Sequence, residues 1–290
     1  MPLILEVFTP GSETMIQISN LSFCYETSGR GKVVALRDVD LAVQEGEFVA
    51  ILGTNGCGKT TLAKHLNGLL VPTKGTVLIN GWSTSDPSTL WKIRQNVGYI
   101  FQNPENQIVA TLVEEDIAFG PENLGLPPSE IKSRVKNALK AVGMSDFARW
   151  EPHFLSAGQQ QRIALAGVLA MEPKVIVLDE PTSMLDSAGR KQVLKLIKDL
   201  KQYKGTTIVY ITHFIQEAIE ADRVVIMQDG KIFQEGAPRD VLTDPMRLRD
   251  LGISPLPINE LAVGLARAGL NLPTVVLGVE EMVRVLCSLN

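Results

Sequence analysis

The chain has 290 residues, a length that gives one sizeable core with room for a small appendage. Its apolar fraction of 45% and charged fraction of 21% are those of an ordinary globular protein. The formal net charge of −4 argues against a general affinity for nucleic acid or anionic lipid, since either would favour a basic face.

Cysteine usage and hydropathy exclude two further classes of protein. The three cysteines are scattered and include no CxxC pair, so we expect reduced thiols in a cytoplasm and neither a disulfide frame nor a zinc site. Residues 1–8 lack the features of a signal peptide. No run approaches the roughly 18 apolar residues of a membrane span. Any membrane part would come from another chain.

The first predicted elements are strands. Residues 15–18 alternate apolar and polar like an edge strand, and residues 39–43 alternate in the same way. Tyr25 lies between them, where an aromatic ring could stack on a nucleobase or simply pack in the core. The apolar run Phe48–Leu52 predicts a buried strand, and Leu62, Leu66 and Leu69 then repeat at helical spacing.

A glycine-rich loop joins that strand to that helix. Its residues are Gly53, Thr54, Asn55, Gly56, Cys57, Gly58, Lys59, Thr60 and Thr61. Strand, glycine-rich loop, Lys-Thr and helix form a phosphate-binding P-loop, in which backbone N–H groups, the helix dipole and Lys59 all attract phosphate. Thr60 would place a hydroxyl on magnesium and Thr61 one on a phosphate. A glycine turn that binds nothing would not need the Lys-Thr pair, so the sequence predicts a nucleoside triphosphate site.

The remaining elements alternate between strands and helices. Apolar runs predict strands at residues 76–79, 97–101, 175–178 and 206–211, and a hairpin turns at Asp229-Gly230. Helices are predicted from Asp86-Pro87 through residues 90–94, and over residues 129–142, 159–170, 190–203 and 280–286. The polar, helical middle predicts a subdomain inserted into a parallel α/β core.

Several polar residues follow predicted strands, where the ligands of a parallel sheet gather. Asp179 is placed to support a Mg²⁺ shell, and Glu180 to orient or deprotonate the attacking water; the alternative is a solvated acidic pair. Gln102 and His213 each end a strand within reach of metal, phosphate or water, although a lone strand-end histidine is more often structural. Cys57, beside a helix N-terminus, is expected to have a lowered thiol pKa and to react with alkylating agents.

A second backbone cradle precedes the helix predicted over residues 159–170. It consists of Leu155, Ser156, Ala157, Gly158 and Gln159. Small residues there expose N–H groups at a helix N-terminus, which suits an anion. Because one nucleotide cannot use two distant cradles of one chain, we expect a dimer in which each chain's second cradle closes over the other's nucleotide.

Together these motifs resemble those of the ABC-type ATPases, the nucleotide-binding subunits of ABC transporters, over residues 14–240. In this resemblance Tyr25 matches the A-loop aromatic, Gln102 the Q-loop and His213 the switch histidine. Residues 53–60 match the Walker A motif, and residues 155–159 match the signature. Residues 175–179 match Walker B, and Glu180, which follows, matches the catalytic glutamate. Residues 183–186, with Asp186, match the D-loop. The family's usual Leu-Ser-Gly-Gly-Gln has alanine at Ala157, whose methyl group would be unfavourable if that position required a positive φ.

The resemblance implies a fold and a mechanism. The fold is an α/β P-loop NTPase core with a parallel sheet, an antiparallel β subdomain, a helical subdomain at about residues 103–170 and a small α-rich domain at residues 241–290, a candidate for dimerisation. ATP would bind with its adenine on Tyr25, and Mg²⁺ would be held by Thr60 and Gln102 with support from Asp179. Glu180 and His213 would align the water for in-line attack.

A narrower resemblance links residues 102–107 and 113–120 to the energy-coupling factor (CbiO-like) ATPases of vitamin and metal-ion importers. It implies a homo- or heterodimer at the cytoplasmic face of the cell membrane, working with a transmembrane coupling protein and a substrate-binding membrane subunit. Nucleic acid is not expected as a partner. Two alternatives stay open: a soluble ABC ATPase acting on nucleic acid or ribosomes, and a regulatory ABC subunit with weak catalysis.

Overall fold

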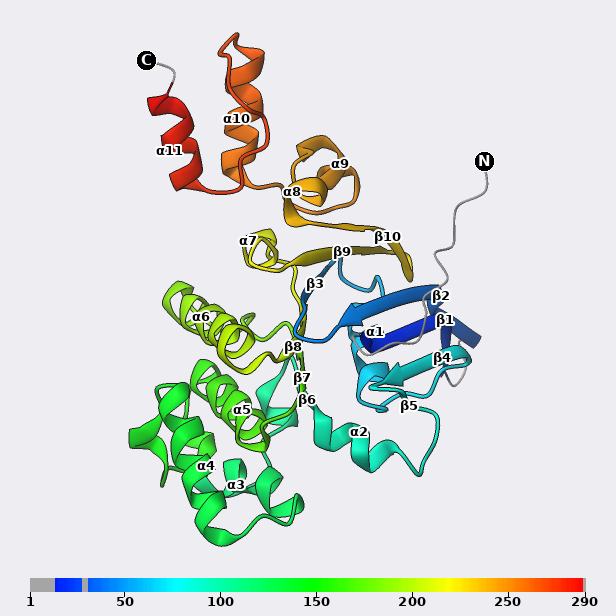
Figure 1. Cartoon of the computed structure of the whole chain (residues 1–290), viewed down its shortest axis with the longest axis vertical. Coiled ribbons are helices and arrows are strands. Elements are labelled where there is room, and N and C mark those ends of the chain that lie inside the picture. Colours follow the sequence, from blue (N-terminus) through cyan, green and yellow to red (C-terminus); the bar gives the residue numbers. More distant parts are fainter. Residues whose placement is uncertain (1–13, 28–30, 289–290) are drawn as a thin grey trace.

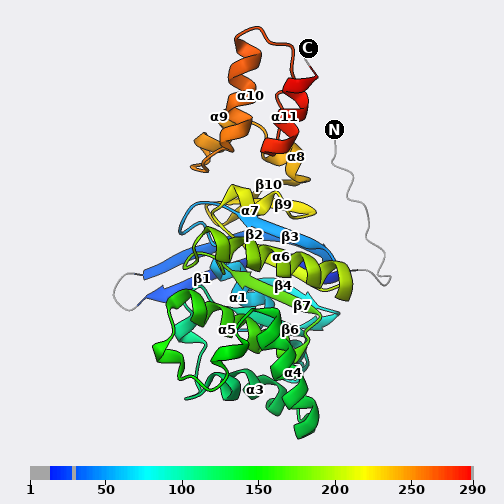
Figure 2. The same ribbon diagram turned by 90° about the vertical axis from the view of Figure 1, so that its left-hand side faces the viewer.

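The computed structural model describes residues 14–27 and 31–288, so the prediction about residues 1–8 lies outside the described part. Two sheets form its centre (Figure 1). One is antiparallel with strand order β2-β1-β4-β5, and the other has the order β10-β9-β3-β8-β7-β6. Helices cover the larger sheet, and the last four helices extend beyond β9 and β10 (Figure 2). The predicted α/β fold class is confirmed.

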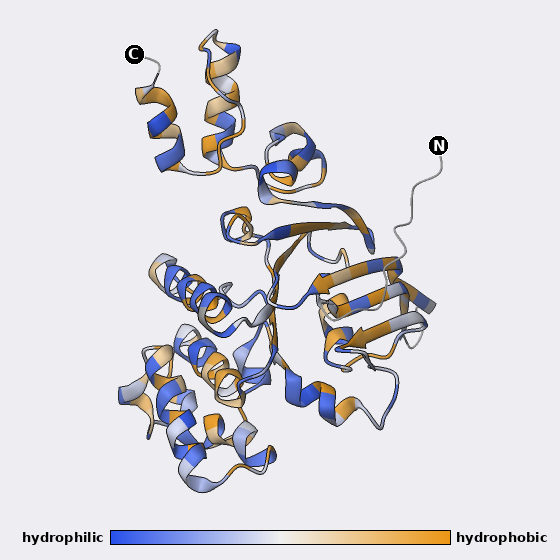
Figure 3. Cartoon of the chain, in the orientation of Figure 1, coloured by the Kyte–Doolittle hydropathy of each residue, from blue (hydrophilic) through white to orange (hydrophobic). Residues whose placement is uncertain are grey.

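The larger sheet is parallel except for its last strand. Its strands are β3 (Phe48–Leu52), β6 (Val97–Ile100), β7 (Val175–Asp179), β8 (Thr207–Ile211), β9 (Arg223–Gln228) and β10 (Lys231–Gly236). Every residue of β3, β6, β7 and β8 is buried, because helices or the second sheet cover both faces. This is why these strands read as continuous apolar runs, seen as the hydrophobic centre of Figure 3. Only β10, paired with β9 through the predicted hairpin, runs antiparallel.

The antiparallel sheet comprises β1 (Thr14–Thr27), β2 (Gly31–Gln44), β4 (Lys74–Ile79) and β5 (Trp82–Ser83). The prediction that residues 15–18 form an edge strand is wrong, because β1 pairs with β2 on one side and with β4 on the other. The alternation of apolar and polar residues reports one buried face of a strand. It does not report how many neighbours the strand has.

Successive side chains of a strand point to opposite faces of the sheet, so the parallel strands separate the interior into two cores. Val49 and Ile51 of β3 face a core shared with the antiparallel sheet and with α1 (Lys59–Leu66). Phe48, Ala50 and Leu52 face the other core, which contains α5 (Ala157–Met171) and α6 (Ser187–Lys204). The two helices that follow the two predicted cradles, α1 and α5, therefore lie on opposite faces of one sheet (Figure 1).

The inserted helical region contains α3 (Val113–Asn123), α4 (Pro128–Ala141) and α5, with short 3₁₀ turns before α3 and between α4 and α5. Before it, α2 (Leu90–Asn96) begins later than predicted. Asp86 forms a turn, in which its carbonyl accepts from the Thr89 N–H at 3.0 Å and its carboxylate accepts from Ser88. The expected start of that helix at Asp86-Pro87 is therefore wrong.

Helix α1 is shorter than its apolar spacing predicted. It ends at Leu66, and Gly68 reverses the chain with a φ of 62°. Leu69 consequently lies outside the helix and is 43% exposed. The leucine spacing in the sequence therefore extends past the end of the helix.

The C-terminal region consists of α8 (Pro238–Val241), α9 (Pro245–Asp250), α10 (Pro257–Arg267) and α11 (Val279–Cys287). Buried side chains as far as Leu256 belong to the core that contains α5 and α6, and the partly buried Ile258 and Leu277 pack against it. Ala262, Val276 and Met282 form a small cluster of their own. None of the helices that the structure describes is long and apolar enough to cross a membrane.

Candidate functional site

The P-loop follows β3 at its carboxyl end and leads directly into α1. At two positions of the loop, neighbouring backbone leaves no room for any residue but glycine. A Cβ on Gly53 would lie 2.4 Å from the Met227 carbonyl oxygen, and a Cβ on Gly58 would lie 2.7 Å from the Ala35 carbonyl oxygen. Gly58 also has a φ of 108°, which L side chains rarely adopt. The loop is thereby held against β9 and β2 while its backbone curls. No side chain caps α1, so its first N–H groups are free to meet an anion.

Lys59 places a positive charge within this curl. Its side chain is only 5% exposed, and its Nζ donates to the carbonyl oxygens of Gly53 at 2.8 Å and Thr54 at 2.9 Å. A buried ammonium needs such partners, because burying an unpaired charge is strongly unfavourable. The chain itself therefore folds the lysine over the concave side of the loop, where a phosphate would lie.

Asp179 meets α1 because of the alternation along β7. It lies on the same face as Val175 and Val177, which is the face that α1 covers. Its carboxylate accepts from the Thr60 hydroxyl at 3.0 Å and from the Tyr99 hydroxyl at 3.1 Å. Burial raises the pKa of Asp179, and these two hydrogen bonds oppose the rise. The carboxylate is thus held within the core in a position where a cation would stabilise it.

Glu180 turns away from the core with a left-handed backbone, at a φ of 49°. For a residue other than glycine this conformation costs about 1–3 kcal/mol. It is held by hydrogen bonds from the Glu180 N–H to the Ile211 carbonyl at 3.0 Å and from Ser183 to the Glu180 carbonyl. The carboxylate accepts from Gln102 Nε2 at 3.0 Å and lies 3.3 Å from Nδ1 of His213. Three strand ends thus bring these three side chains together.

Tyr25 reaches the loop from the antiparallel sheet. Its hydroxyl lies 3.2 Å from the Thr61 hydroxyl, and its ring packs edge-to-face on Phe23. Phe23 in turn packs on His65 of α1, which is fully buried. Tyr25 itself is 38% exposed, so its ring packs on Phe23 and is partly open to solvent. That arrangement suits an aromatic platform for a base.

The second cradle is built differently. Ser156 caps α5 in a capping box: its hydroxyl accepts from the Gln159 N–H at 3.3 Å, and the Gln159 side chain accepts from the Ser156 N–H at 2.8 Å. Ala157 is the first helical residue and is not among the residues of positive φ, so the expected penalty for its methyl group does not arise. Among the described residues, no hydrogen bond joins this cradle to the P-loop.

The second cradle instead contacts the segment that follows Glu180. A Cβ on Gly158 would lie 3.1 Å from the Leu185 side chain, so the cradle rests against residues 184–185. Asp186 then caps α6, its carboxylate accepting from the Gly189 N–H at 2.7 Å. This segment is therefore the structural link between the two cradles within one chain.

The expected lowering of the Cys57 pKa is wrong. Its side chain is 5% exposed, because it fills the space beneath Gly53, where an added Cβ would come within 2.6 Å of Sγ. Burial raises the pKa of the thiol, while neighbouring Lys59 opposes the rise. The helix N-terminus that was expected to lower the pKa is outweighed by desolvation.

Sequence reasoning missed three residues that hold the site in place: Tyr99, Gln107 and Gln161. Tyr99 bonds Asp179 directly. Gln107 accepts from the Phe101 N–H at 3.2 Å, and Gln161 donates to the Phe101 carbonyl at 3.3 Å, so both fix the backbone next to Gln102. The available signal was a polar residue within an apolar segment, since Tyr99 lies in a buried strand and Gln161 is buried on α5.

This fold and site define a P-loop nucleotide-binding protein in which the N-termini of α1 and α5 lie apart. A family model described as ABC transporter matches residues 36–183. The chain is 50% identical over 279 residues to the energy-coupling factor transporter ATP-binding protein EcfA1 of Clostridium novyi, covering 96% of this chain and 100% of the relative. It is 44% identical to the cobalt import ATP-binding protein CbiO of Syntrophus aciditrophicus, covering 93% and 95%.

Solved structures agree with this likeness. The structure of cbiO1 from Clostridium perfringens, described as part of the ABC transporter complex cbiONQ, superposes with a TM-score of 0.72 at 34% identity, covering 89% of this chain and 98% of that one. The dimeric ATP-binding cassette MJ0796, in a post-hydrolysis state with ADP and Pi, has the same TM-score and identity, covering 78% and 99%.

The chain belongs to the ATP-binding subunits of ABC transporters, and within them to the energy-coupling factor and CbiO group. It is accordingly an ATPase of the importer type, as the sequence predicted. The relatives' names give no support to the alternative of an ATPase acting on nucleic acid.

Proposed function

We propose that this chain hydrolyses ATP to drive uptake of a vitamin or metal ion through a membrane partner, and that each chain supplies half of every composite ATP site. The observation that carries the proposal is the grouping of Gln102, Glu180 and His213 beside the buried Asp179 and the P-loop. A carboxylate held by an amide and an imidazole can orient a water for in-line attack on the γ-phosphate.

Within its own half, the chain binds the nucleotide from three sides. The ring of Tyr25 stacks on the adenine, the N–H groups of residues 53–61 surround the phosphates, and the Lys59 ammonium neutralises their charge. Glu180 accepts the proton of the attacking water, while the His213 imidazole holds that water or the γ-phosphate in line. Glu180 accepts from Gln102, whereas Asp179 accepts from Thr60 and Tyr99, so the two carboxylates have separate partners for separate roles.

Thr60, Gln102 and Asp179 have the donor chemistry for Mg²⁺. A hydroxyl, an amide oxygen and one carboxylate, completed by phosphate oxygens and water, form the oxygen set that this cation prefers. The raised pKa of the buried Asp179 fits this role, because a nearby cation would favour its charged form. When bound, Mg²⁺ would neutralise charge on the β- and γ-phosphates. The Asp179–Thr60 hydrogen bond positions both residues for this task.

The second half of the site comes from another chain. Since α1 and α5 lie on opposite faces of one sheet, the cradle at Ser156 and Gly158 serves a nucleotide on a second cassette chain, identical or paralogous. The segment at residues 184–186 lies between the two cradles and responds to closure. Movement of the helical region around α3 and α4 then acts on the membrane partners, a coupling protein and a substrate-binding subunit, at the cytoplasmic face.

The test isolates the tagged chain from its own membranes and measures ATP hydrolysis and the accompanying proteins. We expect a second cassette chain and membrane proteins to co-purify, with ATPase activity that requires Mg²⁺. Lys59→Ala should abolish ATP binding and leave the assembly intact, because Lys59 lies within the loop and away from the helical region. An active preparation without any membrane protein, or full ATP binding by the Lys59→Ala chain, would contradict the proposal.

A further inference from the structure

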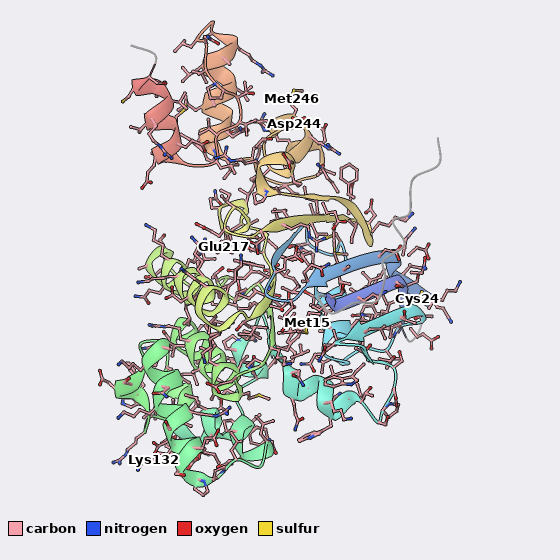
Figure 4. The ribbon with its side chains drawn as sticks, viewed as in Figure 1. Met15, Cys24, Lys132, Glu217, Asp244 and Met246 are labelled. Atoms are coloured by element: carbon pink, nitrogen blue, oxygen red, sulfur yellow. The ribbon has the colours of Figure 1, made fainter. Side chains whose placement is uncertain are left out.

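A buried carboxylate lies beyond the site described above. Glu217, on the short helix α7 (Ile215–Ala218), is 3% exposed and lies beside the six-stranded sheet (Figure 4). It accepts hydrogen bonds from three hydroxyl groups, those of Thr182 at 2.6 Å, Thr212 at 2.5 Å and Tyr210 at 3.1 Å. No lysine, arginine or histidine among residues 14–27 and 31–288 forms an ion pair with it.

Burying such a carboxylate carries a large desolvation cost. A buried charge without an ion-pair partner depends mainly on its hydrogen bonds, and an apolar side chain of similar volume would avoid that cost. Burial and the Glu217 carboxylate raise the pKa of Tyr210, so that phenol stays a donor. The three hydroxyl donors all point at one acceptor. The cluster therefore fixes the positions of the segments that carry them.

Two of those segments carry the catalytic groups. Thr212 directly precedes His213, and its hydroxyl also accepts from the Phe214 N–H at 3.0 Å, so it fixes the backbone on both sides of the histidine. Thr182 follows Glu180 by two residues, and its carbonyl accepts from the Leu185 N–H at 3.1 Å. Glu217 thus joins the segment that holds His213 to the turn between Glu180 and Asp186.

The cluster lies on the other face of the sheet from Asp179. Tyr210 contributes to the core that α5 and α6 share, whereas Val175 and Val177, which lie on the same face of β7 as Asp179, contribute to the core beside α1. Glu217 therefore lies on the opposite face of the sheet from Asp179 and α1. Its influence on ATP passes through the loops that it ties together.

We propose that Glu217 is a positioning residue that keeps His213 and Glu180 in register and transmits displacement of the turn at residues 182–186 to His213. This rests on the proposed function and deepens it. When the second chain's cassette presses on that turn, the Thr182–Glu217–Thr212 connection moves the histidine segment with it. Closure of the dimer and alignment of the water are thereby linked through one carboxylate.

The test is a double-mutant cycle between Glu217→Gln and His213→Ala, with ATP affinity and the hydrolysis rate measured separately. Glutamine keeps the shape but forces one hydroxyl partner to reverse its hydrogen bond. We expect Glu217→Gln to lower kcat about 10- to 30-fold with little change in ATP affinity, and to lower it about threefold or less once His213 is alanine, the remainder acting through Glu180. Equal losses with and without the histidine would overturn the proposal, because a merely structural effect adds.

Two further variants keep the test decisive. Thr182→Val removes one hydroxyl and leaves two, and should show a smaller loss with the same dependence on His213. Thr84→Val is the matched control: Thr84 is fully buried and its hydroxyl has no partner, so neither rate nor affinity should change. Unchanged kcat in both Glu217→Gln and Thr182→Val would refute the role.

A spectroscopic measurement covers the case of very low activity. The sequence has three histidines, so the ring signals of His65, His153 and His213 can be assigned by single substitutions. Glu217→Gln should shift the ring signal of His213 and leave that of the exposed His153 in place. An unmoved His213 signal would contradict the proposal. If the wild-type chain bound ATP but showed no hydrolysis, the proposed function would fail, whereas the His213 shift would still report on Glu217.

Discussion

The two helix N-termini that we propose for nucleotide binding are built in opposite ways. At α1 no side chain caps the first turn, and Lys59, Thr60 and Asp179 place charges and a hydroxyl within or beside the loop. At α5 a capping box already satisfies part of the first turn, and no acidic residue lies in that turn. The first cradle is open and surrounded by reactive groups, and the second is compact and neutral.

This contrast bears directly on the proposed two-chain site. A cradle that holds all the charges can bind ATP alone, whereas a neutral cradle provides only oriented donors. Bringing the second onto the first adds donors to the γ-phosphate without adding a group that must change its protonation. In the proposed two-chain site, the catalytic groups come from the chain that contributes the P-loop, and closure by the second chain sets when hydrolysis occurs.

The largest expected effect lies at the first cradle. Glu180→Gln keeps the side chain's shape and its contact with Gln102 but removes the base, so hydrolysis should fall about 10²- to 10⁴-fold. ATP binding should persist, because the loop and Lys59 are untouched. Single-turnover kinetics with a parallel binding measurement would show this. Loss of binding together with turnover would mean that Glu180 shapes the loop and is not confined to chemistry.

The next effect breaks the second cradle. Gly158→Asp adds a negative charge to the second cradle, with its Cβ against the Leu185 side chain. Repulsion of the opposing phosphates should lower hydrolysis by the assembled complex about 100-fold. ATP binding to the separate chain should not change.

Gly167→Asp is the matched control, because it introduces the same side chain on the same helix. Gly167 has open space around it, and a Cβ there meets nothing within 4 Å. Its activity should stay near that of the wild type. Equal losses for both variants would assign the effect to α5 as a helix and not to the cradle.

The smallest effect concerns thiol reactivity inside the first cradle. Cys57 is buried with a raised pKa, whereas Cys287 is exposed, so alkylation of Cys57 should be at least about tenfold slower, since it requires the loop to open. Mass spectrometry after timed labelling would give the order. Rapid labelling of Cys57 would mean that the loop is less closely packed against Met227 than its geometry indicates.

Much of the first cradle could be predicted from sequence because its constraints are local. The strand Phe48–Leu52 is apolar because both its faces are buried, and the glycines follow from a backbone that must curl. The end of α1 was missed since Leu69 continues the apolar repeat, while the conformation of Gly68 stops the helix. The expected low pKa of Cys57 failed because burial under Gly53 depends on distant Met227.

The supporting residues could not be predicted, because their roles depend on which strands are neighbours. Tyr99 meets Asp179 only because β6 pairs with β7. Thr182, Tyr210 and Thr212 converge on Glu217 through the pairing of β7 with β8 and the turn into α7. The local sequence pattern does not indicate that β6 pairs with β7, nor that β7 pairs with β8.

The most direct test of the two-chain site measures how much ATP the isolated complex retains after gel filtration. With Glu180→Gln, closure without hydrolysis should leave ATP trapped in the complex. Adding Gly158→Asp should release most of it, because the lid over the partner's nucleotide is lost, whereas adding Gly167→Asp should not. Full retention in the Glu180→Gln, Gly158→Asp complex would contradict a site shared between two chains.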